Sequence, residues 1–246
     1  MDCTHHPLTL LTNCMRVVIA GDSWGAHSYE RDYIHPDLKG FKWKEKKKYV
    51  LYPGPGDLLK EVLDVEIITT ADHGYSNKEA LDALEKIVTK EDVVIFYQTG
   101  MLREVYKAHL DKVDHYSTDS YQKDFQHYEN IFYERCKKIN AKHFALIGGC
   151  AQINSTMAKK NNINVLLPSI TEWLHPEFKD NQFDNTTYWL EYQYSCSDFK
   201  NAVIESHKKI KFWETNKINF CRDHPTVGAN RKLVKEIIKK HVEKTN

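Results

Sequence analysis

Five short, mostly apolar runs recur along the chain, and segments of helical periodicity separate several of them. The runs cover residues 15–20, 64–70, 93–98, 143–149 and 163–167. Runs of this length and composition are typical of strands in a parallel sheet that is covered on both faces. Strands that alternate with helices predict an α/β fold with a doubly wound sheet, in a single domain spanning residues 1–246.

The helical segments are recognised by their caps and apolar spacing. The sequence SNKE at 76–79 is a capping-box pattern, in which Ser76 caps the early amides and Glu79 reaches back to the cap residue. Apolar residues then recur at helical spacing as far as Val88. Further helices are expected over residues 121–139, 199–215 and 226–243.

Three segments lack such periodicity. Residues 28–57 are expected to be irregular, with a basic run at 42–49 and the breaker-rich PGPGD at its end. The basic run is either a solvated face or a loop that attracts an anionic substrate. Residues 168–199 carry many aromatics among polar residues, as a cap packed on the core or as a surface that stacks on a sugar. Residues 1–14 are interpreted as a possible flexible extension.

Charge and hydropathy argue against nucleic-acid-binding and membrane-spanning proteins. The 35 Lys and Arg residues nearly balance the 34 Asp and Glu residues, so a nucleic-acid partner is not expected. No apolar run reaches the roughly 18 to 20 residues that a membrane-spanning helix needs, so no membrane partner is expected. The first residues lack the pattern of a secretory signal, which favours a cytoplasmic location.

The cysteines and histidines give no metal-binding pattern. None of the 6 cysteines forms a CxxC pair, and no HExxH sequence occurs among the 13 histidines. Reduced thiols, no metal site and no cofactor are therefore expected.

The carboxyl ends of the predicted strands are where such sheets bind ligands. The first strand runs into Gly21-Asp22-Ser23, and the second runs into Asp72-His73-Gly74. Near the end of the chain, His224 stands between Asp223 and Pro225, just before a helix. Ser23 can serve as a nucleophile if a base such as His224 reaches it. On the residues alone, a turn serine and a helix-entry histidine are an equally open interpretation.

The segments VVIAGDSWG at 17–25 and DHPTVGANRKL at 223–233 together resemble the first and last motifs of the SGNH/GDSL hydrolase superfamily. The resemblance implies a three-layer α/β/α sandwich of flavodoxin-like type, with a central parallel sheet of about five strands. It implies that Ser23 is the nucleophile, that its own amide is an oxyanion donor, and that His224 is the general base. Gly74, followed by Leu81 seven residues later, matches the glycine whose amide is the second oxyanion donor.

Two motifs depart from the family pattern. The third strand ends Gln98-Thr99-Gly100-Met101, without the asparagine whose side chain completes the family's oxyanion hole. Gln98 or Thr99 is expected to donate instead. The family's acid position, three residues before the histidine, is Cys221 here, so Asp223 is the candidate acid. The alternative is a Ser-His dyad in which a backbone carbonyl holds the imidazole.

The sequences GDSWG, GYSN, QTG with Arg103 shortly after, and LIGGC resemble a group of small SGNH-like proteins of phage and environmental bacterial type. Asn77 of GYSN and Arg103 join the candidate oxyanion and substrate-binding residues. Arg103 either anchors a substrate carboxylate or pairs on the surface.

These patterns predict a serine-dependent esterase or acyl hydrolase that works through an acyl-serine intermediate. The expected substrate is a small-molecule or carbohydrate ester, with a carbohydrate O-acetylesterase as one subtype. The alternative is a binding or structural protein on the same scaffold, with weak or no catalysis, which the missing asparagine and the displaced acid favour.

Overall fold

The computed structural model describes residues 15–28, 53–101, 103–104, 118–149, 152–176, 220–221 and 224–245. Within these residues lies a five-stranded parallel sheet with the strand order β2-β1-β3-β4-β5. The strands are β1 (Arg16–Gly21), β2 (Glu66–Thr69), β3 (Val93–Gln98), β4 (His143–Gly148) and β5 (Asn164–Leu167). This order is the flavodoxin-like one, and the α/β fold class predicted from the sequence is confirmed.

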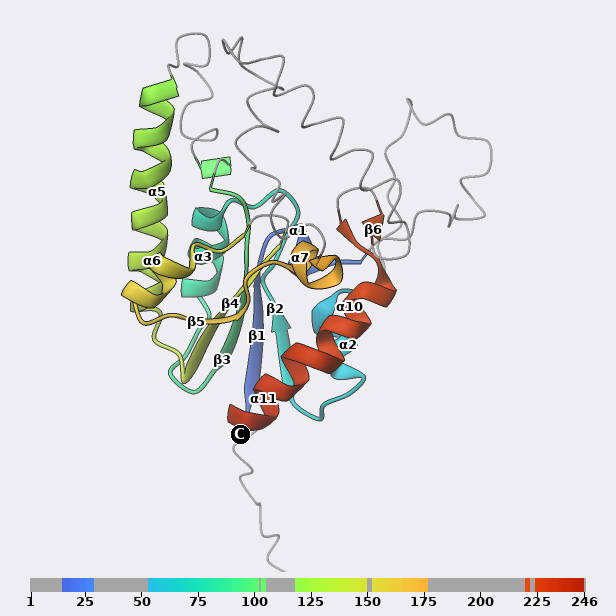
Figure 1. Ribbon diagram of the computed structural model, residues 1–246. Helices are drawn as coiled ribbons and strands as arrows, with labels where there is room; N and C mark the ends of the chain where they lie inside the picture. The colour runs from blue at the N-terminus through green and yellow to red at the C-terminus, as the bar shows by residue number, and fades with distance from the viewer. Residues whose placement is uncertain are drawn as a thin grey trace, which may run out of the picture.

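Helices cover both faces of the sheet, which gives three layers (Figure 1). One face carries α2 (Pro55–Lys60) and the C-terminal α10 (Val227–Leu233), π-helix η4 (Val234–Ile238) and α11 (Lys239–Thr245). The other face carries α3 (Asn77–Glu85), α5 (Thr118–Lys138) and α6 (Ser155–Lys160).

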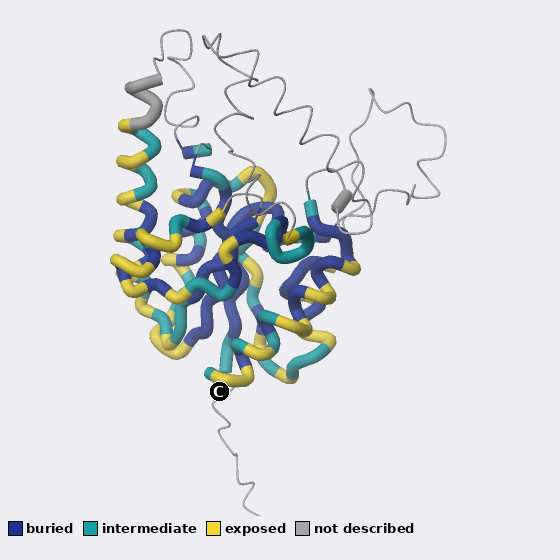
Figure 2. The backbone as a smooth tube through the Cα atoms, viewed as in Figure 1, coloured by how far each residue is buried: buried dark blue, intermediate teal, exposed yellow. Residues whose placement is uncertain are grey.

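Each strand divides its side chains between the two cores. Val17 and Ile19 of β1 pack under the C-terminal helices, whereas Val18 and Ala20 pack under α3 and α5. The central strands are therefore buried on both sides, as the dark interior of Figure 2 shows. The apolar runs of the sequence reflect this double burial.

The predicted capping box forms as expected at the start of α3. Glu79 N donates to Ser76 Oγ at 3.3 Å, and Ser76 N donates to the Glu79 carboxylate at 2.8 Å. The long helix and the final helix also form, within a few residues of their predicted bounds. The helix predicted over residues 199–215 lies outside the described residues, as do residues 1–14, the basic run at 42–49 and residues 177–199.

The prediction of irregular structure as far as residue 57 is wrong, because α2 begins at Pro55. A proline in the first helical turn has no N–H to lose, and Asp57 Oδ2 accepts a hydrogen bond from Gly54 N at 3.1 Å. A side chain at Gly54 would collide with the carbonyl oxygen of Ala26. The PGPGD sequence therefore starts a helix and lets it approach the chain after β1. The segment 168–199 begins with another helix, α7 (Ile170–Leu174).

An ion pair closes the amino end of the sheet. Arg16, the first residue of β1, donates to both carboxylate oxygens of Asp92 at 2.7 and 2.6 Å. The same guanidinium donates to the carbonyl of Ile87 at 2.9 Å, at the end of α3. No described helix is both long and apolar enough to span a bilayer.

Candidate active site

The candidate nucleophile follows a tight junction at the carboxyl end of β1. Gly21 has a φ of +131°, and a Cβ there would lie 2.7 Å from the Cβ of Tyr97. Only glycine accommodates both this conformation and this close approach of β1 to β3. Asp22 then caps helix α1 (Ser23–Ala26), where its Oδ1 accepts from Trp24 N at 3.0 Å. The turn thus fixes Ser23 as the first residue of a helix.

The backbone amide of Ser23 faces no acceptor within the described part of the chain. Asp22 Oδ1 accepts from Trp24 N, and Asp22 O accepts from Gly25 N and Ala26 N, so the oxygens of Asp22 serve the later amides of the helix. The Ser23 amide, next to a nucleophilic hydroxyl, suits an oxyanion.

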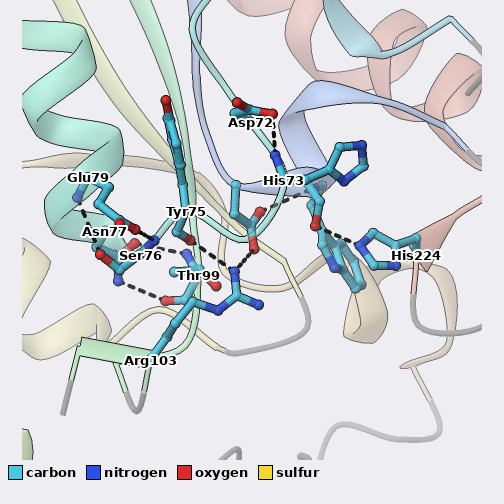
Figure 3. Close-up of polar contacts among 12 residues, drawn as sticks. Asp72, His73, Tyr75, Ser76, Asn77, Glu79, Thr99, Arg103 and His224 are labelled. Carbon is cyan, nitrogen blue, oxygen red and sulfur yellow. Dashed lines mark hydrogen bonds and ion pairs between the residues drawn. The ribbon is translucent and has the colours of Figure 1, made fainter. Parts of the chain in front are cut away.

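The candidate base arrives from the other end of the chain. His224 lies in β7 (His224–Pro225), which pairs antiparallel with β6 (Phe220–Cys221), so that Cys221 is the register partner of His224. Its Nε2 is 2.6 Å from Ser23 Oγ, across 201 residues of sequence (Figure 3). This meets the geometry required for a serine whose proton passes to an imidazole.

The indole ring of Trp24 packs near the imidazole of His224. Its ring centroid is 6.1 Å from that of His224, with the planes inclined at 38°. A Cβ at Gly149 would approach the Trp24 ring to 3.2 Å, so the glycine after β4 makes room for the indole. Gly149 thus lets the helix that begins at Ser23 pack close to the chain after β4.

A buried hydrogen bond that sequence reasoning missed joins the two halves of the site. Asn230 Nδ2 in α10 donates to Ser28 Oγ at 2.8 Å, and both residues are buried. It joins α10, which follows His224, to the segment after α1. The signal was present in the sequence: Asn230 interrupts an apolar stripe that runs from Val227 to Leu233.

Gly74 lies in a turn beyond the end of β2. Its φ is +71°, and a Cβ there would meet nothing within 4 Å. The glycine is therefore needed for its backbone conformation and not for packing space. The preceding amide, His73 N, donates to Asp72 Oδ1 at 2.6 Å, which fixes the start of the turn.

Two further histidines, His27 and His73, lie near His224, and neither was assigned a role from the sequence. The rings of His27 and His73 stack with centroids 5.1 Å apart and planes inclined at 26°. Burial lowers the pKa of His73, and the neighbouring His27 and His224 lower it further. The neutral form of His73 is thus favoured next to the Ser23–His224 pair.

Of the other residues predicted at the site, Asn77 and Thr99 pair at the start of α3, whereas Gln98 bonds to α5. Asn77 Nδ2 donates to the carbonyl of Thr99 at 2.9 Å, and Thr99 N donates to Asn77 Oδ1 at 2.9 Å. Gln98 Oε1 accepts from the hydroxyl of Tyr133 at 3.4 Å, on the face covered by α5. Burial raises the pKa of Tyr133, so its hydroxyl keeps the proton that this bond needs.

Arg103 pairs inside the site. Its Nη1 donates to the carbonyl of Tyr75 at 2.9 Å and lies 3.5 Å from Asp22 Oδ2 (Figure 3). The side chain is 23% exposed. The structure thus brings Ser23 to His224, and Arg103 to the Gly74 turn and the residue before Ser23.

Asp223, the predicted acid, lies outside the described residues. No group of three His, Cys, Asp or Glu side chains suited to a metal ion occurs in the described part of the chain.

Comparison with protein-family models gives no match, and comparison with curated proteins gives none. Several solved structures resemble the chain remotely, and three of them are described below. The YxiM protein of Bacillus subtilis is 11% identical with a TM-score of 0.45, over 94% of this chain but only 56% of that one. A lipase/acylhydrolase from Enterococcus faecalis is 15% identical with a TM-score of 0.37, over 80% and 96% of the two chains. The psychrotrophic esterase EstA from Pseudoalteromonas sp., inhibited by monoethylphosphonate, is 15% identical with a TM-score of 0.34, over 82% and 99%. All three are remote in sequence, so the roles of Ser23 and His224 rest on the geometry of this chain.

Proposed function

We propose that the protein is a serine-dependent esterase or acyl hydrolase of SGNH type. One observation carries the proposal: Ser23 Oγ lies 2.6 Å from His224 Nε2 at the carboxyl end of a parallel sheet. A serine at this place in an α/β sheet, in contact with an imidazole, is equipped for nucleophilic attack.

The reaction would proceed in two steps. His224 Nε2 accepts the proton of Ser23 Oγ as that oxygen attacks the ester carbonyl, and the amides of Ser23 and Gly74 stabilise the resulting oxyanion. The carbon–oxygen bond to the alcohol then breaks, and His224 returns the proton to the departing oxygen. Water repeats the sequence on the acyl-serine: His224 takes its proton, and Ser23 Oγ leaves with that proton as the acid product is released.

Asp223 is the proposed acid that holds the imidazole, because it adjoins His224 in sequence. A backbone carbonyl in the same role would give a dyad. In either case the partner orients the ring and stabilises the imidazolium that forms during attack.

A carbohydrate ester is the proposed substrate subtype, on account of the aromatic residues at 168–199. Of these, Trp173 is partly buried against the core, and Lys232 Nζ lies 4.8 Å from the centre of its ring. Trp173 therefore packs on the C-terminal helices, and sugar stacking would fall to the aromatic residues between 177 and 199.

A weakly catalytic binding protein is the second candidate. Its support is that the side chains of Gln98 and Asn77 and the amide of Thr99 already bond within the protein. Loss of one oxyanion donor costs about 3 to 4 kcal/mol of transition-state stabilisation. Turnover of simple esters would then be slow and still depend on Ser23.

The test is hydrolysis of p-nitrophenyl acetate, butyrate and longer esters by the wild type and by Ser23→Ala. We expect the variant to lose at least about 1000-fold in kcat, because no other group replaces the attacking oxygen. Ser155→Ala, at an exposed serine in α6, is the matched control and should keep wild-type turnover. Equal turnover by wild type and Ser23→Ala would show that Ser23 is not the nucleophile.

A further inference from the structure

The oxyanion side of the site depends on turns that the sheet does not hold. The hydrogen bonds between β1 and β2 end with Asp72 N to Gly21 O at 3.3 Å, so Gly74 and Tyr75 lie beyond them. The pairing of β1 with β3 ends at Gly21 and Tyr97, and that of β3 with β4 ends at Gln98. Side chains must therefore set the position of the Gly74 turn relative to Ser23.

Among the described residues, four in the chain after β3 bond to the start of α3, and one of them is Met101, whose Sδ accepts from Asn77 Nδ2 at 3.5 Å. Thr99 pairs with Asn77, Arg103 donates to the carbonyl of Tyr75, and Glu104 Oε1 accepts from Lys78 N at 2.6 Å. Among these residues, Arg103 also reaches the turn before Ser23, through the ion pair with Asp22 at 3.5 Å.

The carboxylate of Asp22 is consequently held at both oxygens. Its Oδ1 accepts from Trp24 N in the nucleophile helix, and its Oδ2 faces Arg103 Nη1. The same nitrogen donates to Tyr75, one residue after Gly74. Arg103 thus connects the turns after β1 and β2 through a single nitrogen atom, as the dashed lines of Figure 3 show.

We infer that Arg103 is a positioning residue that fixes the Gly74 turn relative to the Ser23 amide. It compensates for the family asparagine missing after β3, by placing backbone donors and not by donating to the substrate. The inference rests on the proposed esterase function. A guanidinium suits this role because Nη1 carries two N–H groups in the fixed plane of the group, so one nitrogen can face a carboxylate and a carbonyl at once.

The experiment measures kcat and KM of p-nitrophenyl acetate and of 4-nitrophenyl hemisuccinate for Arg103→Met and Arg103→Lys. We expect Arg103→Met to lower kcat by about 100-fold, the effect of misplacing reacting groups by about 1 Å. The KM for both esters should stay within about threefold of wild type, because Arg103 touches no substrate. Arg103→Lys keeps the positive charge but lacks the planar guanidinium. Its kcat should therefore lie between those of the wild type and Arg103→Met.

Arg135→Met is the matched control. Arg135 is 22% exposed and pairs with Asp82 and Glu85 of α3, and it bonds to none of the site residues described above, so kcat and KM should not change. If Arg103→Met does not fold, Arg103→Lys decides by the same criteria.

Two results would overturn the inference. One is wild-type kcat in the folded Arg103 variant. The other is a raised KM for the hemisuccinate alone with kcat unchanged, which would make Arg103 a substrate carboxylate anchor. Failure of the proposed function is distinguishable, since the wild type would then hydrolyse no ester faster than Ser23→Ala.

Discussion

Two arginines at opposite ends of the sheet each contact a carboxylate and a backbone carbonyl, but the arginine–carboxylate distances differ. At the amino end, Arg16 joins β1 to Asp92 before β3 and to the carbonyl of Ile87 after α3. At the carboxyl end, Arg103 after β3 joins Asp22 after β1 and the carbonyl of Tyr75 before α3. Each arginine thus pairs with one carboxylate and donates to one backbone carbonyl. The carbonyl bound by Arg16 follows α3, and the carbonyl bound by Arg103 precedes it.

The difference lies in the carboxylate contact. Arg16 uses two nitrogens at 2.6 and 2.7 Å on a carboxylate that is 1% exposed, whereas Arg103 uses one nitrogen at 3.5 Å. Burial raises the pKa of Asp92, but the hydrogen bonds from Arg16 and Thr89 outweigh it and lower the pKa below its ordinary value. The tight connection stabilises the fold, and the looser one lies where the chemistry is proposed to occur.

The largest expected effect on stability is at Arg16. Arg16→Met leaves the buried Asp92 carboxylate without its partner, which should lower the free energy of unfolding by about 3 kcal/mol. Urea denaturation measures this loss. The kcat of the folded variant should be unchanged, whereas Arg103→Met should lose less stability and more kcat. Equal losses of stability at the two arginines would contradict the comparison.

A smaller effect is expected from His241, which lies in α11 near the start of β4. Burial lowers its pKa, as do His143 and Lys244, and its Nε2 has no hydrogen-bond partner in the described structure. His241 therefore binds a proton near pH 6.5 in the unfolded chain but only at lower pH in the folded chain. The free energy of unfolding consequently falls as the pH drops below about 6.5.

His241→Leu removes this titration. The fall in Tm between pH 7.5 and 5.5 should be smaller than in the wild type, by at most about 2 °C because the half-exposed ring is screened by solvent. Differential scanning calorimetry measures it. A variant whose Tm falls as steeply as that of the wild type would show that His241 does not contribute.

The fold was predictable because its strands are buried on both faces. Side chains of Val17 to Ala20 pack alternately into the two cores, so the run is apolar without interruption. The start of α3 was predictable because Ser76 and Glu79 form a local capping box. Helix α2 was missed because the glycines in PGPGD look like chain breakers. Gly54 is required by the Ala26 carbonyl, a contact between residues distant in sequence that no local pattern encodes.

Only those site residues that belong to a short sequence motif could be predicted. Ser23 and His224 follow from short sequence patterns, and the structure places their side chains in contact. Arg103 pairs with Asp22 and Tyr75, and Asn230 pairs with Ser28, only because segments distant in sequence meet in the fold. A polar residue within an apolar helical stripe was the only sequence signal for Asn230, and none identified the partner.

The most direct test of the central claim is labelling with a fluorophosphonate, which reacts with an activated serine whatever the natural substrate. The account predicts one phosphonyl group per chain, located on Ser23 by peptide mass spectrometry, and labelling at least about 100-fold slower in His224→Ala. Labelling of another residue, or no labelling of wild-type protein, would contradict an activated Ser23–His224 pair.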